Sequence, residues 1–339
     1  MFTTAAELDE FLTRPSQADC EAMRELSGDL MILGVGGKMG PSLAIRARRA
    51  CDRAGVRKRV IGVSRFGTSG ARADLEAAGV ETVCGDLLNP SDLRGLPQIE
   101  NVIFMAGRKF GTQGGEHLTW AMNVLLPAMV ADRFAESRHV VFSSGNVYPL
   151  RRAAEGGARE DMPTDPVGEY AQTVRGRERI FQYYADRNGT PSVLLRLNYA
   201  VEMRYGVLAD IGRNVFERRP VYVNMAHVNV IWQGDANSIA IRAFPLCQTP
   251  PTVLNVTGPE ILSVRWIAER FGEHFGIEPI VQGIEGPSAL LNDASRAIAR
   301  FGPPSVSVAK AIEWTADWIR AGGESLQKPT HFEARDGRF

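Results

Sequence analysis

The stretch from Leu30 to Gly40 reads LMILGVGGKMG and decides the fold. Its first four residues, Leu30–Leu33, are all apolar, which is typical of a parallel strand buried on both faces. Three glycines follow at a spacing of three: Gly34, Gly37 and Gly40. Such a turn lets backbone N–H groups approach a pyrophosphate and lets the next helix, predicted over Pro41–Ala50, pack against its strand. The stretch therefore predicts a binding site for a dinucleotide.

The next predicted strand, Arg59–Val63, indicates which dinucleotide is bound. It ends in Ser64 and Arg65, about twenty-five residues past Gly40, where the residue that reads the ribose is expected. An acid there would bind the ribose 2′-hydroxyl and repel a phosphate, whereas a hydroxyl and a guanidinium suit a 2′-phosphate. The pair favours NADP, with NAD as the alternative.

Composition limits the classes of partner. The 339 residues can form a full α/β core and a second lobe, and 39 basic residues balance 39 acidic ones. This balance predicts a small-molecule substrate, with no nucleic acid or membrane as partner. The four cysteines and five histidines are scattered without ligand spacing, so we expect reduced thiols and no metal site. No signal-peptide pattern or membrane-length apolar run is present, and we expect a cytoplasmic protein.

Strand patterns alternate with helical patterns from Leu30 to Leu197, which predicts an α/β fold with a Rossmann-type, doubly wound parallel sheet. The further predicted strands are Glu81–Cys84, Asn101–Ala106, Arg138–Ser143 and Ser192–Leu197. The long helices among them are His117–Glu136 and Glu169–Asn188.

The alternation of strand and helix patterns stops on both sides of the region Leu30–Leu197. Thr4–Leu26 has the spacing of one or two helices, which we expect to cap the sheet edge or to form a dimer contact. After Asn198 the elements become shorter, with amphipathic helices near Val264–Phe275 and Val308–Ala321, which indicates a smaller C-terminal α/β lobe for the substrate. The expected organisation is an N-terminal helical extension (1–28), a dinucleotide-binding domain (29–198), a mainly substrate-binding lobe (199–322) and a C-terminal tail (323–339).

Five motifs in order resemble the extended short-chain dehydrogenase/reductase family, and more narrowly its NAD(P)-dependent epimerase/dehydratase branch. They are the glycine turn, GDL at Gly85–Leu87, NVIFMAG at Asn101–Gly107, SSGNVY at Ser143–Tyr148 and EYAQ at Glu169–Gln172. The resemblance runs from about Leu30 to Ile319 and includes the region Leu291–Gly302. It implies an oxidoreductase or epimerase of carbohydrate metabolism, and the family's pairing through two long helices implies a homodimer.

The resemblance also assigns roles to single positions. Ser144 matches the catalytic hydroxyl and Tyr170 the catalytic tyrosine, which carries the proton of the reacting hydroxyl while hydride moves to or from the nicotinamide. Asp86 would receive the adenine amino group, and Asn123 matches a helix asparagine that supports the site. Together with the residues derived above, the expected cofactor-binding set is Gly34, Gly37, Lys38, Met39, Gly40, Ser64, Arg65, Asp86, Leu87, Met105, Ala106, Gly107, Asn123, Ser143 and Asn198.

One departure from the family concerns the proton carrier. A tyrosine acts in this way when a nearby ammonium lowers its pKa, and the family places that lysine four residues after the tyrosine. Here the position is Val174, which carries no charge. Arg175 is rotated by about 100° around the helix and cannot take its place. The candidates for the missing charge are Arg177, Lys109 and Arg108.

Three interpretations therefore stay open. The first is an active oxidoreductase or epimerase in which another group replaces the missing lysine. The second is a regulatory or scaffold protein that binds NADP without hydride chemistry. The third is chemistry with another proton carrier, for which Tyr148 is the second choice after Tyr170. Tyr170 itself could also be a buried helix tyrosine whose hydroxyl caps a backbone group.

The sequence says less about the substrate. The stretch Arg108–Glu116 combines positive charge with glycines just after a strand, so it could contact a carboxylate or phosphate, or be a solvated turn. Arg204 and Tyr205, and the run His227–Ile231, fall where the resembling family shapes its sugar pocket; they could bind hydroxyls or hold the second lobe together. The expected substrate is a hydroxylated sugar-like molecule or sugar acid, bound by Lys109, Asn146, Arg204 and His227.

Overall fold

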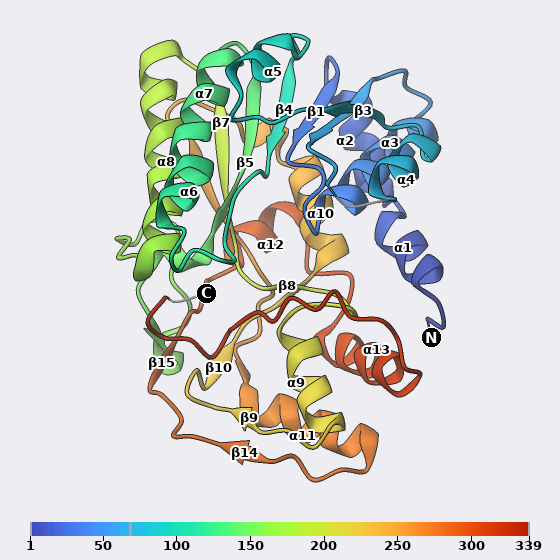
Figure 1. The fold of residues 1–339 in the computed structure, drawn as a ribbon, viewed down its shortest axis with the longest axis vertical. Helices are drawn as coiled ribbons and strands as arrows, with labels where there is room; N and C mark the ends of the chain where they lie inside the picture. Colours follow the sequence, from blue (N-terminus) through green and yellow to red (C-terminus); the bar gives the residue numbers. More distant parts are fainter. Residues whose placement is uncertain (1, 68–69, 338–339) are drawn as a thin grey trace.

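The computed structural model describes residues 2–67 and 70–337 and is built around a seven-stranded parallel sheet (Figure 1). The strand order is β12-β7-β5-β4-β1-β2-β3. The strands are β1 (Leu30–Leu33), β2 (Val60–Ser64), β3 (Glu81–Cys84), β4 (Asn101–Phe104), β5 (Arg138–Ser144), β7 (Ser192–Leu197) and β12 (Thr252–Val256). All neighbouring pairs are parallel, so the predicted fold class and the six predicted strands are confirmed.

Helices cover both faces of the sheet, which explains why β1 is apolar throughout. Leu30 and Ile32 pack into the core beneath α3 (Gly40–Ala54) and α10 (Gln233–Arg242). Met31 and Leu33 point to the opposite face, into the core shared with α5 (Pro90–Gly95), α7 (Leu126–Arg133) and α8 (Gly168–Asn188). Alternation of side chains along a strand thus fills two separate cores.

Two helices precede the sheet, as predicted: α1 (Ala5–Thr13) and α2 (Gln17–Glu25). They pack on α3 and α10, on the outside of a helical layer, and not on a sheet edge, which β3 and β12 form. A buried ion pair fixes this contact: Asp19 lies 2.7 Å from the Arg46 guanidinium and accepts a hydrogen bond from Ser238. The extension is therefore part of the body of the protein.

The second lobe is built on α9 (Val207–Phe216), α11 (Val264–Phe275) and α13 (Val308–Arg320), which share one apolar cluster. Two of these helices match the predicted ones. The chain does not stay in this lobe between 199 and 322, because α10 and β12 return to the sheet body. The strand β12 was not predicted.

Shorter elements complete the described chain. They are α4 (Ala71–Ala77), α6 (Glu116–Trp120), the π-helical turn η1 (Ala121–Leu125), α12 (Ser295–Phe301), the 3-10 turns η2 (Gly145–Val147), η3 (Ala153–Glu155) and η4 (Phe244–Leu246), and the two-residue strands β6 (Arg151–Arg152), β8 (Ala200–Val201), β9 (Val221–Tyr222), β10 (His227–Val228), β11 (Ile231–Trp232), β13 (Leu262–Ser263), β14 (Val281–Gln282) and β15 (Ser288–Ala289). Among the helices of the described residues, none has the length and apolar character needed to cross a membrane.

The tail after α13 runs back across the front of the molecule, between the sheet body and the second lobe (Figure 1). Thr330 donates from its backbone N–H and its hydroxyl to Asp210 of α9, at 2.8 and 2.6 Å. Phe332 is buried in the cluster of the second lobe, and Gly337 lies against Gly168 at the start of α8. The tail is thus tied to both parts of the protein.

Candidate active site

The glycine turn after β1 fits the expected dinucleotide cradle. Gly34 has φ +91°, and a Cβ there would lie 2.6 Å from the Cα of Ala106, while a Cβ at Gly40 would collide with the backbone carbonyl of Val35. These two positions therefore require glycine. Gly37 has open space where a Cβ would stand, apart from one contact with the carbonyl of Gly34. The turn leads directly into α3, and the positive end of that helix's dipole favours an anion beside the turn.

A cavity of about 410 Å³ opens beside this turn, at the carboxyl ends of β1, β4, β5 and β7. The chain changes direction between β1 and β4, and ligands of open α/β sheets bind at such a switch point. The predicted residues that line the cavity are Gly37, Lys38, Met39, Met105, Gly107, Lys109, Ser143, Ser144, Asn146, Tyr170 and Asn198. Eleven residues from five separate segments are thus brought to one site.

The other predicted cofactor residues lie outside the lining of this cavity. Ser64 stands against Gly36 of the glycine turn, and the Arg65 guanidinium lies 3.9 Å from the Asp86 carboxylate. Ser64, Arg65 and Asp86 thus follow the ends of β2 and β3, next to the turn. Leu87 is buried in the apolar core with α5 and α7.

Asn123 supports the site and offers no free group to a cofactor. The π-helical turn η1 directs it inward, where its Oδ1 accepts from the Arg108 backbone and from Arg177, at 2.9 and 2.8 Å. Its Nδ2 donates to the Arg108 carbonyl and the Thr173 hydroxyl. Since the amide is fully used by the protein, the expected cofactor contact is corrected to a positioning role.

Ser144 and Tyr170 form a hydrogen-bonded pair in the cavity. The Ser144 hydroxyl also donates to the Asn146 Oδ1 at 2.9 Å and accepts from the Asn146 backbone N–H at 3.2 Å. Burial raises the pKa of Tyr170, while Arg177 and the Ser144 hydrogen bond act in the opposite direction. The phenol therefore holds its proton at neutral pH and is placed to donate it.

Arg177, one of the candidates for the missing charge, lies close enough to Tyr170 for its charge to lower the pKa of the phenol. It stands seven residues after Tyr170, two turns along α8, so both side chains lie on the same face of that helix. Its guanidinium donates to the Phe142 carbonyl at 2.6 Å and to Asn123 at 2.8 Å, and burial lowers the pKa of Arg177 to about 10. Val174 packs instead into a small apolar cluster with Val147 and Tyr148.

Two lysines lie at the cavity. Lys38 of the glycine turn is 3.3 Å from the ring centroid of Tyr205, and burial lowers the pKa of Lys38 to about 7 against the attraction of Glu202. Lys109 of the loop after β4 lies 5.8 Å from the Tyr170 ring centroid, and burial lowers its pKa to about 8. Both ammonium groups would gain from a nearby anion.

Ser143 and Asn198 line the cavity but are partly used by the protein. The Ser143 hydroxyl donates to Glu178 at 2.6 Å, and Glu178 forms a buried ion pair with Arg196. Burial raises the pKa of Glu178, yet Arg196 and Ser143 outweigh this and hold it below its usual value. The Asn198 amide donates to Asn229 at 2.8 Å.

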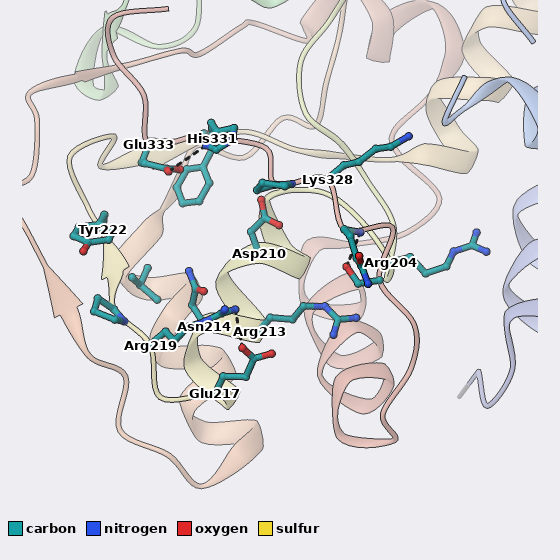
Figure 2. Close-up of a pocket in the computed structure, with 16 residues that line it drawn as sticks. Arg204, Asp210, Arg213, Asn214, Glu217, Arg219, Tyr222, Lys328, His331 and Glu333 are labelled. Carbon is teal, nitrogen blue, oxygen red and sulfur yellow. Dashed lines mark hydrogen bonds and ion pairs between the residues drawn. The ribbon is translucent and has the colours of Figure 1, made fainter. Parts of the chain in front are cut away.

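Two predicted substrate residues are not brought to the cavity. Arg204 forms ion pairs with Asp9 at 2.7 Å and Glu202 at 3.2 Å, and it lines a second, outer cavity of about 650 Å³ between α9 and the tail (Figure 2). His227 belongs to β10, which pairs with β13, and it lines neither of the two cavities. These two residues are therefore not brought together with Lys109 and Asn146, and the Arg204–Asp9 pair holds the second lobe to α1.

Tyr148, the second choice as proton carrier, is buried away from the cavity. Its hydroxyl accepts from Arg196 at 2.6 Å and donates to Asn255 at 2.9 Å. A phenol held on both sides by protein cannot exchange a proton with a substrate. The interpretation that uses Tyr148 is excluded by this geometry.

Sequence reasoning missed the lining residues Tyr199, Lys328 and Thr330, whereas Tyr205, expected beside Arg204 in the region of the sugar pocket, does line the cavity. Tyr199 has φ +43°, a left-handed conformation that a tyrosine rarely adopts, at the point where the chain leaves β7. Nothing in the sequence of the polar tail indicates that Lys328 and Thr330 reach the cavity.

Known structures share this fold. UDP-glucuronic acid 4-epimerase from Bacillus cereus, in complex with UDP-glucuronic acid and NAD, is 18% identical with a TM-score of 0.71, covering 86% of this chain and 99% of its own. Thermus thermophilus UDP-glucose 4-epimerase with NAD is 19% identical with a TM-score of 0.70 and covers 86% and 99%. A dTDP-glucose 4,6-dehydratase from Streptomyces venezuelae with NAD bound is 18% identical with a TM-score of 0.73 and covers 86% and 97%. No curated protein matched the sequence.

A family model gives the more specific match. It describes the NAD dependent epimerase/dehydratase family and covers residues 30–201, from β1 to β8, which is half of the chain. This segment holds the glycine turn, the Ser144 and Tyr170 pair and Arg177. The chain belongs to the NAD dependent epimerase/dehydratase family.

Proposed function

We propose that the protein is an NAD(P)-dependent oxidoreductase or epimerase that acts on a hydroxylated sugar-like molecule or sugar acid. The observation that carries this proposal is the Ser144 and Tyr170 pair in a cavity beside the glycine turn, with Arg177 behind it. A protein that had lost catalysis would not require the paired hydroxyls of Ser144 and Tyr170 beside the buried cation Arg177. A dinucleotide would be held by the glycine turn, the N-terminus of α3 and the loop after β4.

When bound, the nicotinamide ring supplies hydride acceptance or donation at its C4. The protein supplies the proton transfer. Tyr170 donates its proton to a carbonyl oxygen or, as phenolate, removes the proton of a hydroxyl, and Ser144 orients that oxygen. Arg177 stabilises the phenolate in the second case, since an opposite charge favours the ionised form.

Two variants test the proposed proton transfer most directly. Tyr170→Phe should retain cofactor binding and lose turnover, because it removes only the proton carrier, and Ser144→Ala should behave in the same way. Calorimetry measures binding, and nicotinamide absorbance measures turnover across a panel of sugars and sugar acids. Failure of the wild-type protein to bind NADP(H) or NAD(H) would refute the proposal.

We further propose a preference for NADP over NAD, although the three related structures above contain NAD. The support is chemical. Ser64 and Arg65 follow β2 beside the glycine turn, and Arg65 is an exposed guanidinium that can reach a 2′-phosphate.

A homodimer through the two long helical segments is the proposed assembly. Large apolar side chains are exposed on these segments: Leu118, Trp120 and Leu125 on α6 and η1, and Tyr183 on α8. Such groups are expected to be covered in solution. Sedimentation equilibrium of the wild type and of Leu125→Glu tests this, and a monomeric wild type would refute it.

The second candidate is a regulatory protein that binds NADP without turnover. It is favoured by the exchange of the lysine for Val174, which lies in an apolar cluster and contributes no charge. This candidate predicts tight NADP binding, with no turnover of any sugar and no effect of Tyr170→Phe.

A further inference from the structure

A buried carboxylate, that of Glu178, lies behind the serines that end β5. It belongs to α8 and is closed off from solvent. Each of its two oxygens accepts two hydrogen bonds. Oε1 accepts from the Ser143 hydroxyl at 2.6 Å and from the Arg196 Nε at 2.8 Å, and Oε2 accepts from Arg196 and Arg175 at 2.8 and 2.6 Å. A carboxylate has about four such acceptor positions, so this one is fully used by the protein.

The groups bound to this carboxylate come from the elements that build the inner cavity. The helix α8 packs against β5 and β7 (Figure 1). Ser143 is on β5 directly before Ser144, and Arg196 is on β7 two residues before Asn198. The helix itself carries Tyr170. One carboxylate thus joins the three elements from which a serine, an asparagine and the phenol reach the cavity.

The contact between α8 and β5 is doubled by the preceding residue of the helix. Arg177 donates to the Phe142 carbonyl at 2.6 Å, and Glu178 accepts from the Ser143 hydroxyl at the same distance. Consecutive residues of the helix therefore hold consecutive residues of the strand. A shift of β5 along α8 would have to break both bonds, so Ser144, the next residue of the strand, is held in place on the helix.

The charge of Glu178 is balanced where it stands. Burial raises the pKa of Glu178, but the bonds from Arg196 and Ser143 outweigh this effect and hold the pKa below its usual value. Arg175 adds a second positive charge at 2.6 Å. The carboxylate is therefore ionised at neutral pH and acts as a hydrogen-bond acceptor only. A fully satisfied buried network of this kind is rigid.

We infer that Glu178 is a positioning residue for the proton transfer. It is not among the described residues that line the cavity. By fixing Ser143, it keeps the next hydroxyl of β5 within hydrogen-bond distance of the Tyr170 phenol. The inference rests on the proposed function, in which Ser144 and Tyr170 act as a pair. A purely stabilising ion pair would not have this role, because the bond to Ser143 should matter to the reacting pair even where the fold is retained.

The test is made on the protein without cofactor or substrate. In protein labelled with carbon-13 tyrosine, the ζ-carbon resonance of Tyr170 reports the hydrogen bond of the phenol at neutral pH and the pKa in a titration. Ser143→Ala removes the hydroxyl that binds Glu178 and changes no charge. We expect this variant to alter the resonance at neutral pH and to raise the pKa of Tyr170 by about 0.5 to 1, because the bond with Ser144 lowers that pKa.

Two variants serve as controls, and urea unfolding establishes that each variant is folded. Ser137→Ala removes another buried hydroxyl, which lies just before β5 and donates to the Ile99 carbonyl at 2.5 Å. It should leave the Tyr170 resonance unchanged. Ser143→Thr keeps the hydroxyl that binds Glu178, so it should retain the resonance of the wild type.

Glu178→Gln separates positioning from charge. Removal of a negative charge near the phenol would by itself lower the pKa of Tyr170, whereas a weakened bond with Ser144 raises it. We expect a rise, and if this variant does not fold, Ser143→Ala decides alone.

Three results would overturn the inference. They are an unchanged Tyr170 resonance in Ser143→Ala, an equal change in either control, and a lower pKa of Tyr170 in Glu178→Gln. A wild-type protein that binds no nicotinamide dinucleotide would refute the proposed function instead, and the resonance of the cofactor-free protein would still show whether Glu178 positions the pair.

Discussion

Replacing Arg177 by methionine tests how the site acts without its usual lysine. The side chain makes two buried hydrogen bonds, to Phe142 at 2.6 Å and to Asn123 at 2.8 Å, and its charge lowers the pKa of Tyr170. An opposite charge a few ångströms from an ionisable group shifts its pKa by about 1–3 units. Because burial has already raised the pKa of Tyr170, loss of Arg177 should raise it further by that amount.

The consequence for catalysis follows from this shift. A phenolate that is about 10- to 1,000-fold rarer at a given pH lowers the rate of hydroxyl oxidation by the same factor. The acid limb of the pH–rate profile moves to higher pH by about 1–3 units. Arg177→Lys keeps the charge while losing the forked hydrogen bonds, so it should retain most of the rate.

Nuclear magnetic resonance of tyrosine labelled with carbon-13 measures the pKa without a substrate, with Tyr170→Phe used to assign the resonance. Both Arg177 variants lose buried hydrogen bonds, at about 1–3 kcal/mol each, and urea unfolding separates this loss of stability from the charge effect. If Arg177→Met stays folded and leaves the pKa of Tyr170 unchanged, the assignment of Arg177 as the replacement charge is wrong.

Two further predictions address cofactor choice and stability. Arg65→Asp should weaken NADPH binding at least about tenfold and spare NADH, as measured by calorimetry, and an equal loss for both cofactors would remove Arg65 from the 2′-phosphate site. Asp19→Ala leaves the buried guanidinium of Arg46 without its carboxylate, and it should lower the free energy of unfolding by about 3–5 kcal/mol. The control is Asp52→Ala, which removes an exposed ion pair and should change the free energy of unfolding by less than about 1 kcal/mol. Similar urea midpoints for these two variants would contradict the burial argument.

The sequence predicted the sheet well where strands are uniformly apolar. The strand β12 was missed because its buried Asn255 interrupts the apolar pattern. The partners of that amide are distant in sequence: its Nδ2 donates to the Ala158 and Asp293 carbonyls, and its Oδ1 accepts from the Tyr148 hydroxyl. Such a polar strand becomes recognisable once its hydrogen-bond partners are in place.

The site was predicted in part for a similar reason. Ser144 and Tyr170 lie within motifs, and Arg177 was among the candidates for the missing charge. The position of Arg204 outside the inner cavity could not be predicted, because its partners, Asp9 and Glu202, include a residue nearly two hundred positions away that only the fold brings near. The same applies to Lys328, whose place in the cavity is set by the path of the tail.

The central claim is that the inner cavity binds a dinucleotide with its nicotinamide ring against Tyr170. The most direct measurement is the nuclear Overhauser effect between the nicotinamide protons of bound NADPH and the ring of labelled tyrosine. The account predicts a signal in the wild type that disappears in Tyr170→Phe while NADPH remains bound. A bound cofactor whose nicotinamide signal is unaffected by Tyr170→Phe, or no binding of any nicotinamide dinucleotide, would contradict it.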